Sequence, residues 1–436
     1  MKTRIPKIRP LIVISCCYLL AILAGPVFAA DEYSFDLSAY EKSPFEIGGY
    51  GELRWEHLRL DEDTAIYQLN YFDQDQPDTN DRYTASLQLE GRYSNNQFSA
   101  YARLNPETYN DDFSHDAELT THEAYLSWQA RSSVTIDVGK KLTKWGKGYA
   151  WNPVGFIERP KDPNEPDLAR EGFTVIAGDW IKSRSGDLQT IAFTPVYLPV
   201  TDDMNQDFGP EDDNFAAKLY LLYKDTDVDI MVLSDGSRTA RYGLDFSRNI
   251  TTNFEVHGEW AYVADAPRKI LNDQGTLDTS SNNLQSWLLG LRYLTEKDTT
   301  YIAEYYYNGA GYSDAQMQDF YKLIESVPDQ PNIDLALARA QAIAQAGYVK
   351  QTVMRRYLYL RIMQKEPFDW LYWTPAITAI VNLQDDSYNL APEMVYTGIT
   401  NLELRIKLNY LQGDDYSEFG EKQNDSKLEI RMRYFF

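Results

Sequence analysis

Cysteine is almost absent from this chain of 436 residues, which contains only Cys16 and Cys17. A chain with no cysteine after residue 17 has no disulfide framework, no thiolate metal site and no cysteine nucleophile beyond that point. Histidine is nearly as scarce. The four histidines are His57, His115, His122 and His257. His115 and His122 are seven residues apart, which matches no metal-ligand spacing. We therefore expect no metal centre and no cofactor.

Positive charge and long apolar runs are also in short supply. Lys and Arg number 42 against 65 Asp and Glu, which gives a net charge of −23. A nucleic-acid-binding protein needs clustered positive charge to displace counterions from phosphates, so this class is excluded. A helical membrane span needs about 20 consecutive apolar residues. The longest apolar stretch, 11–24, has 14 residues, and this excludes a membrane protein built of several helical spans.

The first 30 residues have the parts of a secretory signal peptide. Four Lys and Arg residues lie within 2–9, the apolar stretch 11–24 follows, and two alanines at 29–30 form the end. A lipoprotein signal is the alternative, because 13–16 reads Val-Ile-Ser-Cys, but apolar sequence continues well past Cys16. We expect cleavage after residue 30. This removes both cysteines and takes the net charge from −23 to −27.

Tyrosine is unusually abundant, with 33 residues against 24 glycines and 19 prolines. In the last segment, 427–436, apolar and charged residues alternate strictly. The apolar positions are Leu428, Ile430, Met432, Tyr434 and Phe436. Such period-two alternation indicates a β-strand with a different solvent on each face. The segments 402–410 and 83–93 repeat the pattern.

Alternation of this kind continues through residues 31–436 and predicts 18 strands in all. The other segments lie near 47–60, 96–104, 119–130, 133–142, 173–183, 187–198, 214–224, 227–234, 240–248, 253–264, 284–295, 299–308, 352–364, 370–383 and 387–397. Sixteen strands is the nearest alternative, because the hairpin 227–248 is weakly patterned. Tight turns such as 184–187 alternate with long loops such as 61–80, 105–118 and 265–283.

An even number of strands, joined alternately by tight turns and long loops, is typical of a closed transmembrane barrel. We therefore expect an all-β fold, a closed antiparallel β-barrel formed by 31–436, with tight turns and both termini in the periplasm. A soluble propeller or two-domain sandwich is the alternative. Charge-rich inner faces and aromatic residues near strand ends favour the barrel. These aromatic residues are Trp55, Tyr93, Trp128, Tyr223, Trp260, Tyr262, Tyr293, Tyr410 and Tyr434.

Two segments resemble known families. The ending Tyr434-Phe435-Phe436 resembles the C-terminal signal of Gram-negative outer-membrane barrels, in which the barrel-assembly machinery reads the closing strand and its terminal Phe. The segment 144–153, Lys-Trp-Gly-Lys-Gly-Tyr-Ala-Trp-Asn-Pro, is similar to segments of several porin-like families.

These resemblances imply an outer-membrane protein that contacts lipid and lipopolysaccharide, with a homo-oligomer as an open question. They imply a porin-like channel for passive diffusion of small polar solutes, with sugars and small carboxylates as candidates, rather than an enzyme. A barrel-type hydrolase and an adhesin or structural barrel remain alternatives, although no signature of a phospholipase or omptin-type barrel is present.

Basic residues are concentrated on the three strands that meet where the barrel closes. The predicted pore-wall residues are Arg54, Arg405, Lys407, Lys427, Arg431 and Arg433. Guanidinium forks in a row suit bidentate binding of carboxylate groups. The alternative is that neighbouring carboxylates neutralise the row in cross-strand pairs. The carboxylates in question are Glu52, Glu56, Glu403 and Glu429. An acidic loop facing this wall is compatible with both interpretations.

The connection 143–172 contains four prolines and is therefore stiff. A wide barrel needs an inward element to select solutes, and we expect this segment to fold into the lumen; an external cap is the alternative. The candidate constriction residues are Lys144, Trp145, Lys147 and Trp151.

The connection 309–351 departs from strand periodicity. Ser313 and Gln316 have the spacing of a helix-capping box, and apolar residues follow at helical spacing. Pro328 and Pro331 interrupt the pattern, and Asn332 begins a second helix. We expect a helical hairpin in an extracellular loop at the barrel mouth, and it is the second candidate for narrowing the pore.

Overall fold

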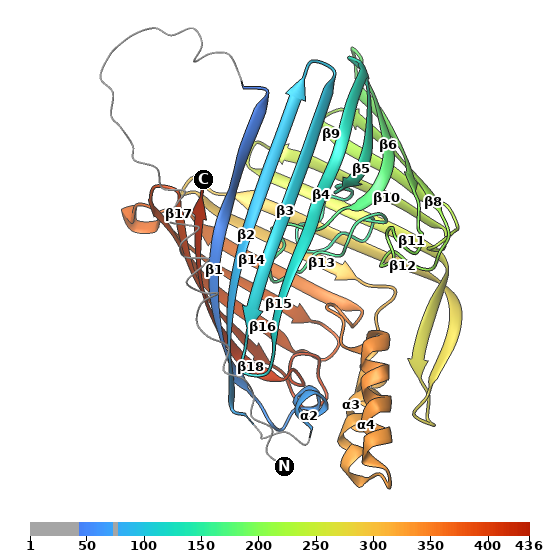
Figure 1. The fold of residues 1–436 in the computed structure, drawn as a ribbon, viewed down its shortest axis with the longest axis vertical. Helices are drawn as coiled ribbons and strands as arrows, with labels where there is room; N and C mark the ends of the chain where they lie inside the picture. Colours follow the sequence, from blue (N-terminus) through green and yellow to red (C-terminus); the bar gives the residue numbers. More distant parts are fainter. Residues whose placement is uncertain (1–42, 73–76) are drawn as a thin grey trace. The chain divides into compact units, whose positions relative to one another are not determined.

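A computed structural model describes residues 43–72 and 77–436, so the predicted signal peptide, 1–30, lies outside the described residues. Within 44–436, 18 antiparallel strands close on themselves (Figure 1). β1 (Phe45–Leu60) pairs with β2 (Thr79–Asn95) on one side and with β18 (Asn424–Phe435) on the other. The predicted 18-stranded closed barrel is confirmed, and the 16-stranded, propeller and sandwich alternatives are wrong.

Each of the other strands pairs with its neighbours in sequence. They are β3 (Phe98–Asn110), β4 (His115–Arg131), β5 (Val134–Lys141), β6 (Phe173–Ser183), β7 (Leu188–Leu198), β8 (Asn214–Tyr223), β9 (Thr226–Leu233), β10 (Arg241–Thr251), β11 (Phe254–Leu271), β12 (Leu277–Leu294), β13 (Thr299–Tyr307), β14 (Arg356–Gln364), β15 (Trp373–Asn382), β16 (Tyr388–Ile399) and β17 (Leu402–Gln412).

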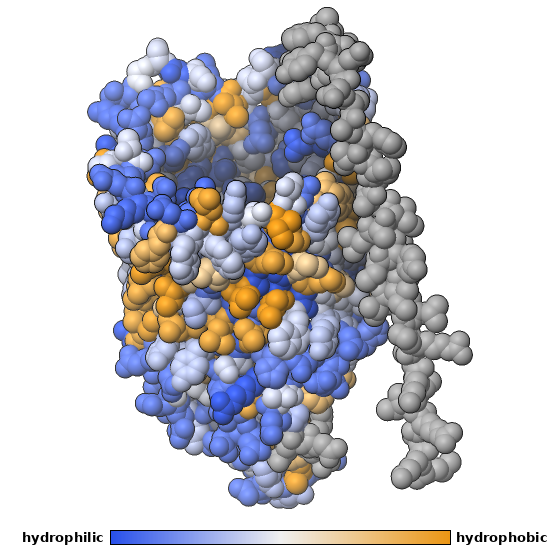
Figure 2. All heavy atoms as spheres, turned by 90° about the vertical axis from the view of Figure 1, so that its left-hand side faces the viewer, coloured by the Kyte–Doolittle hydropathy of each residue, from blue (hydrophilic) through white to orange (hydrophobic). Residues whose placement is uncertain are grey.

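The two faces of the wall differ as the alternation predicts. In β18, Ile430 and Met432 are exposed on the outside, whereas Glu429 and Arg431 are buried on the inside. Figure 2 shows apolar residues gathered in a band at mid-height of the outer surface, with hydrophilic residues above and below. The wall is therefore apolar outside and polar inside.

Two predicted loops are strands instead. β3 and β4 extend through most of 105–118, and β11 and β12 extend through most of 265–283. Much of the β12 extension is exposed, as in the run from Asp278 to Asn283. Where water lies on both faces, a strand has no need of apolar residues on one of them, so the alternation that would reveal it is missing.

The two predicted helices, α3 (Asp314–Glu325) and α4 (Ile333–Ile343), are present, and the Ser313–Gln316 capping box has formed. A third helix, α2 (Ala65–Tyr71), is short and was not predicted. The three share one apolar core and lie at the same end of the barrel, at the bottom of Figure 1. Among the described residues, none of the helices has the length and apolar character of a membrane span.

Candidate functional site

Residues 143–172, hereafter the inner loop, connect β5 to β6 and contact inward-facing residues of distant strands. Lys147 reaches β9, Gly148 reaches β11, Ala150 reaches β13, and Glu165 reaches β17 and β18. The segment therefore lies inside the barrel and spans from the β5–β6 wall to the β17–β18 wall.

Backbone amides of the inner loop bind two buried glutamates of the wall. The N–H groups of Lys147 and Gly148 each donate to Glu259 Oε1 at 2.6 Å. The next two N–H groups, of Tyr149 and Ala150, donate to Glu304. Each carboxylate therefore receives a pair of consecutive backbone donors, and this arrangement fixes the path of the loop along β11 and β13.

Glycine is required at two positions of this turn. Gly146 has φ +93°, and a Cβ atom there would lie 2.7 Å from Glu259 Oε1. A Cβ atom on Gly148 would lie 2.3 Å from the carbonyl oxygen of Trp151. The two glycines are thus explained by the close approach of the backbone to the Glu259 carboxylate at Gly146 and to the Trp151 carbonyl oxygen at Gly148.

Apolar packing holds the first half of the inner loop against the wall. Trp145, Val154, Phe156 and Ile157 are all buried in one cluster. The wall contributes the inward-facing apolar residues Val175, Ala177, Val196, Leu198, Ala216, Met231, Leu233 and Ala261. Fully burying side chains of this size stabilises a fold by about 1.5–3 kcal/mol each, so this half of the loop is part of the protein core.

Trp151 anchors the loop to another part of the wall. Its ring stacks on Tyr306 with centroids 5.1 Å apart, and its indole N–H donates to Thr352 Oγ1 at 3.0 Å. The side chain is 5% exposed. Trp145 and Trp151 are therefore both packed against protein.

Lys147 is the counter-charge of two buried aspartates. Its Nζ atom lies 2.8 Å from Asp229 Oδ2 and 3.9 Å from Asp245 Oδ1. The two aspartates face one another across β9 and β10. Asp245 is fully buried, and neither of its carboxylate oxygens has a hydrogen-bond partner. Without the ammonium group, two carboxylates would lie side by side with no compensating cation.

Glu165 forms the far anchor of the inner loop. Its carboxylate contacts Arg405 at 3.1 Å, Lys407 at 3.0 Å and Arg431 at 3.4 Å. Lys407 also donates to the carbonyl oxygen of Asn164 at 2.6 Å. Burial alone would raise the pKa of the Glu165 carboxyl, but the three cations outweigh it and lower the pKa to about 2.

The other predicted pore-wall residues are also paired with carboxylates. Arg433 lies 2.6 Å from Glu52, Lys427 lies 2.7 Å from Glu56, and Arg54 lies 3.7 Å from Glu56. Arg431 additionally contacts Glu429 at 2.8 Å. The geometry therefore matches the alternative in which carboxylates neutralise the basic row. Glu52, Glu56 and Glu429 take part, and the inner loop supplies Glu165.

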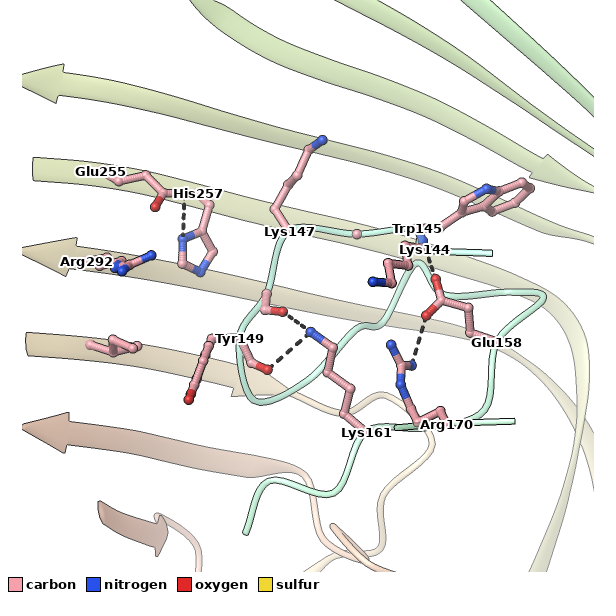
Figure 3. Close-up of a pocket in the computed structure, with 13 residues that line it drawn as sticks. Lys144, Trp145, Lys147, Tyr149, Glu158, Lys161, Arg170, Glu255, His257 and Arg292 are labelled. Atoms are coloured by element: carbon pink, nitrogen blue, oxygen red, sulfur yellow. Dashed lines mark hydrogen bonds and ion pairs between the residues drawn. The ribbon is translucent and has the colours of Figure 1, made fainter. Parts of the chain in front are cut away.

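A cavity of about 280 Å³ lies between the inner loop and the wall of β11–β13 (Figure 3). Five basic residues line it, against two carboxylates, Glu158 and Glu255. The basic residues are Lys144, Lys147, Lys161, Arg170 and Arg292. We call this space the basic cavity.

The five basic residues differ in their partners. Arg170 is paired with Glu158 at 2.8 Å, and Lys161 donates to the carbonyl oxygens of Gly148 and Tyr149. Burial lowers the pKa of Lys161. The side chains of Lys144 and Arg292 are exposed and line the cavity, and within residues 43–72 and 77–436 they make no hydrogen bond or ion pair. They are the two cations available to a solute.

Sequence patterns did not reveal several of these residues. Glu165, Lys161 and Arg170 lie in the predicted constriction segment, 143–172, but the neighbouring sequence does not indicate which residues they bind. Glu259 and Glu304 had the pattern of ordinary inward-facing wall residues. No group of three His, Cys, Asp or Glu side chains within 43–72 and 77–436 is placed to hold a metal ion.

The fold and this loop define a class: a closed antiparallel 18-stranded barrel with a charged loop folded inside. The sequence matches no protein-family model and none of the curated proteins. Among solved structures, the chain is similar to OccK11 (OpdR) of Pseudomonas aeruginosa, with 10% identity and a TM-score of 0.52 over 89% of this chain and 95% of that one. It is also similar to OccK5 (OpdH) of the same organism, with 12% identity and a TM-score of 0.50 over 90% and 98%. At these identities the likeness shows the fold alone.

Proposed function

We propose that the protein is an outer-membrane, porin-like channel through which small polar solutes diffuse passively. The observation that carries this proposal is the polarity of the barrel, which is apolar outside and charged inside. Lipid cannot hydrogen-bond to backbone groups, so a sheet spans a membrane only when it is closed. A barrel of 18 strands is wide enough for an aqueous lumen unless loops fill it.

The inner loop is the proposed constriction. Its anchors lie on opposite sides of the lumen: the apolar cluster with β6–β11 on one, and the Glu165 contacts with β17–β18 on the other. A segment that is anchored on both sides of the lumen keeps a fixed position and narrows the passage permanently. Arg405, Lys407 and Arg431 then contribute to selectivity jointly with Glu165 rather than as free anion-binding forks.

Small carboxylates are the solutes that the basic cavity favours. The side chains of Lys144 and Arg292 have no competing partner, and both line the cavity that a carboxylate would enter. Tyr149 provides aromatic surface in the same cavity, which suits the apolar faces of sugars. Charged side chains of one sign lining a passage raise the local concentration of the opposite ion.

Export and assembly complete the proposal. Residues 1–30 act as a cleaved signal peptide, the tight turns and both termini of the barrel lie in the periplasm, and the α3–α4 hairpin faces outside. The C-terminal Phe436 is the residue that the barrel-assembly machinery reads. Its backbone pairs with Gly49 at 3.1 and 3.2 Å, so the proposed signal lies at the seam where the barrel closes.

Conductance of the purified protein in a planar lipid bilayer tests the function. We expect stepwise channels whose reversal potential in a salt gradient reports ion preference. Absence of channels from protein that is folded by spectroscopic criteria would contradict the proposal. Turnover of phospholipid or peptide by the same sample would favour the hydrolase alternative.

A further inference from the structure

The turn between β14 and β15, residues 365–372, exposes four large apolar side chains. Phe368 is 87% exposed, and Trp370, Leu371 and Tyr372 are each more than half exposed. The rings of Phe368 and Trp370 meet edge to face, 6.1 Å apart. We call these four residues the aromatic turn. Large apolar side chains grouped in this way at a strand end need an explanation.

The other seven turns at the same end of the barrel contain no apolar side chain. They are 96–97 (Asn-Gln), 132–133 (Ser-Ser), 184–187 (Arg-Ser-Gly-Asp), 224–225 (Lys-Asp), 252–253 (Thr-Asn), 295–298 (Thr-Glu-Lys-Asp) and 400–401 (Thr-Asn). Those sequences suit turns that lie in water. The aromatic turn therefore has a different surrounding from its neighbours.

The backbone of this turn is ordered in a costly conformation. Glu366, Phe368, Asp369 and Tyr372 all have positive φ, between 48° and 71°. Left-handed backbone in non-glycine residues is unfavourable and persists only where the surroundings enforce it. Here hydrogen bonds do so: the Tyr372 N–H donates to the Glu366 carboxylate, and the Glu366 N–H donates to the Trp373 carbonyl oxygen, both at 2.9 Å. This hydrogen-bonded backbone conformation holds the apolar side chains of the turn away from the barrel.

The aromatic turn continues the apolar outer surface. Trp373 and Tyr396 lie side by side on the outside of β15 and β16, with ring centroids 4.6 Å apart. Ile377 and Ile399 on the same strands are also exposed. Tyr372 is bonded into this region, because its carbonyl oxygen accepts from the Thr397 N–H at 3.0 Å. In Figure 1 the turn is the orange coil that projects sideways from the strand ends at the left.

We propose that the aromatic turn inserts into the headgroup region of the lipid bilayer and anchors this end of the barrel. Trp and Tyr rings favour the membrane–water boundary, where one edge is apolar and the other meets water. The charged residues of the same turn, Lys365, Glu366 and Asp369, belong on the watery side. The proposal rests on the membrane-spanning barrel proposed above.

A lipid surface fits this patch better than a protein partner does. A stable protein interface takes about 20–30 residues from each side, whereas the patch consists of four side chains on one turn. The turns on either side of it, 295–298 and 400–401, are polar. Its one apolar continuation is the outer face of the wall.

Fluorescent labelling at single cysteines tests the proposal, because the chain has no cysteine after residue 17. A polarity-sensitive probe is attached in three separate variants. They are Phe368→Cys, Leu360→Cys at an outward-facing position in the middle of β14, and Ser185→Cys in a polar turn. Each protein is folded into phosphatidylethanolamine–phosphatidylglycerol vesicles that contain brominated lipid as quencher.

We expect lipid quenching at positions 360 and 368 and none at 185. Quenching at 360 without quenching at 368 overturns the anchor and leaves the membrane barrel standing. No quenching at 360 overturns the membrane barrel itself. A probe at 368 that is shielded from aqueous iodide yet not quenched by lipid would indicate a second copy of the chain or another protein, and that result also overturns the proposal.

A second variant separates insertion from mere proximity to lipid. Replacing Trp370, Leu371 and Tyr372 together by Ser in the Phe368→Cys protein removes the apolar neighbours of the probe. We expect quenching at 368 to fall at least twofold. Quenching at 360, measured in a Leu360→Cys protein with the same three serine substitutions, should be unchanged. Unaltered quenching at 368 would mean that strand geometry alone sets its depth, and the proposed anchor would be wrong.

Discussion

At the scale of single residues, the interior of this barrel is governed by compensation of charge. Nearly every inward-facing ion that we describe has a partner of opposite sign, and several of those partners come from the inner loop. A buried ion whose partner is removed keeps its desolvation cost and loses its compensation. Substitutions within these pairs therefore have larger effects than substitutions of residues that stand alone.

Lys147→Met should be strongly destabilising. It leaves Asp229 and Asp245 adjacent and uncompensated, and breaking a buried pair in this way costs about 3–5 kcal/mol. Lys144→Met is the matched control, since Lys144 is exposed and unpaired. Urea titration of the folded protein in vesicles measures the difference in free energy of unfolding. Equal stability of the two variants would contradict the role assigned to Lys147.

Glu165 and its cations predict selectivity changes of opposite sign. Glu165→Gln leaves Arg405, Lys407 and Arg431 without a shared counter-charge, so the reversal potential should shift toward anions. Replacing Arg405 and Arg431 together by Ala should shift it toward cations. Asp167→Asn in the same loop is the control, because its partner is the Tyr149 hydroxyl rather than a cation. Shifts in the same direction would place the selective region elsewhere.

The same anchor predicts acid tolerance. The pKa of Glu165 is lowered to about 2 from an ordinary value of 4.5. A carboxyl with a depressed pKa contributes stability that is complete above its unfolded pKa and is lost as pH falls through its folded pKa. In the folded protein, Glu165 therefore stays ionised until the pH approaches about 2. The ion selectivity that depends on its charge should be constant from pH 7 to about 5 and change only as pH approaches about 2. Reversal potentials across this range check it; a midpoint near 4.5 would mean that the three cations do not hold Glu165.

At the scale of elements, periodicity located the strands to within a few residues wherever lipid-type and lumen-type faces alternate. It failed for the outer parts of β11 and β12, which project into water and lack the alternation. It also failed for α2, which is too short to show a helical repeat. The α3–α4 hairpin was recognisable because its capping box and apolar spacing are local.

The inner loop shows where local patterns stop being informative. Its prolines and its Trp-Gly-Lys-Gly sequence mark it as special, but it binds charged wall residues that are distant along the chain, 82 residues away for Lys147 and Asp229 and 266 residues away for Glu165 and Arg431. Lys147 remains a candidate constriction residue, but its pairing with Asp229 could not be predicted from the sequence. For Arg405 and Arg431 the sequence left open an anion-binding row or neutralisation by carboxylates, and it did not identify Glu165 as their shared partner. Only the closed topology brings such residues together.

Shortening the inner loop should widen the passage. Replacing 162–168 by Gly-Gly-Ser-Gly removes Glu165 and two prolines while leaving the apolar cluster around Phe156 and Ile157 in place. If this segment narrows the passage, single-channel conductance should rise by about twofold or more. A shortened loop between β11 and β12, at 272–276, serves as the control outside the lumen. If conductance is unchanged, the α3–α4 hairpin becomes the next candidate for the constriction.

At the scale of the whole molecule, an acidic chain carries a basic cavity in its interior. The chain has a net charge of −23, whereas five cations and only two carboxylates line the basic cavity.

Replacing Lys144 and Arg292 together by Met should slow carboxylate entry, because each exposed charge is worth up to about 1 kcal/mol, or about fivefold. Swelling of vesicles in succinate and in arabinose, at equal osmolarity, compares a charged with a neutral solute of similar size. The succinate rate should fall and the arabinose rate should stay the same; an equal fall in both would show that the two residues affect pore width, and that the cavity does not select by charge.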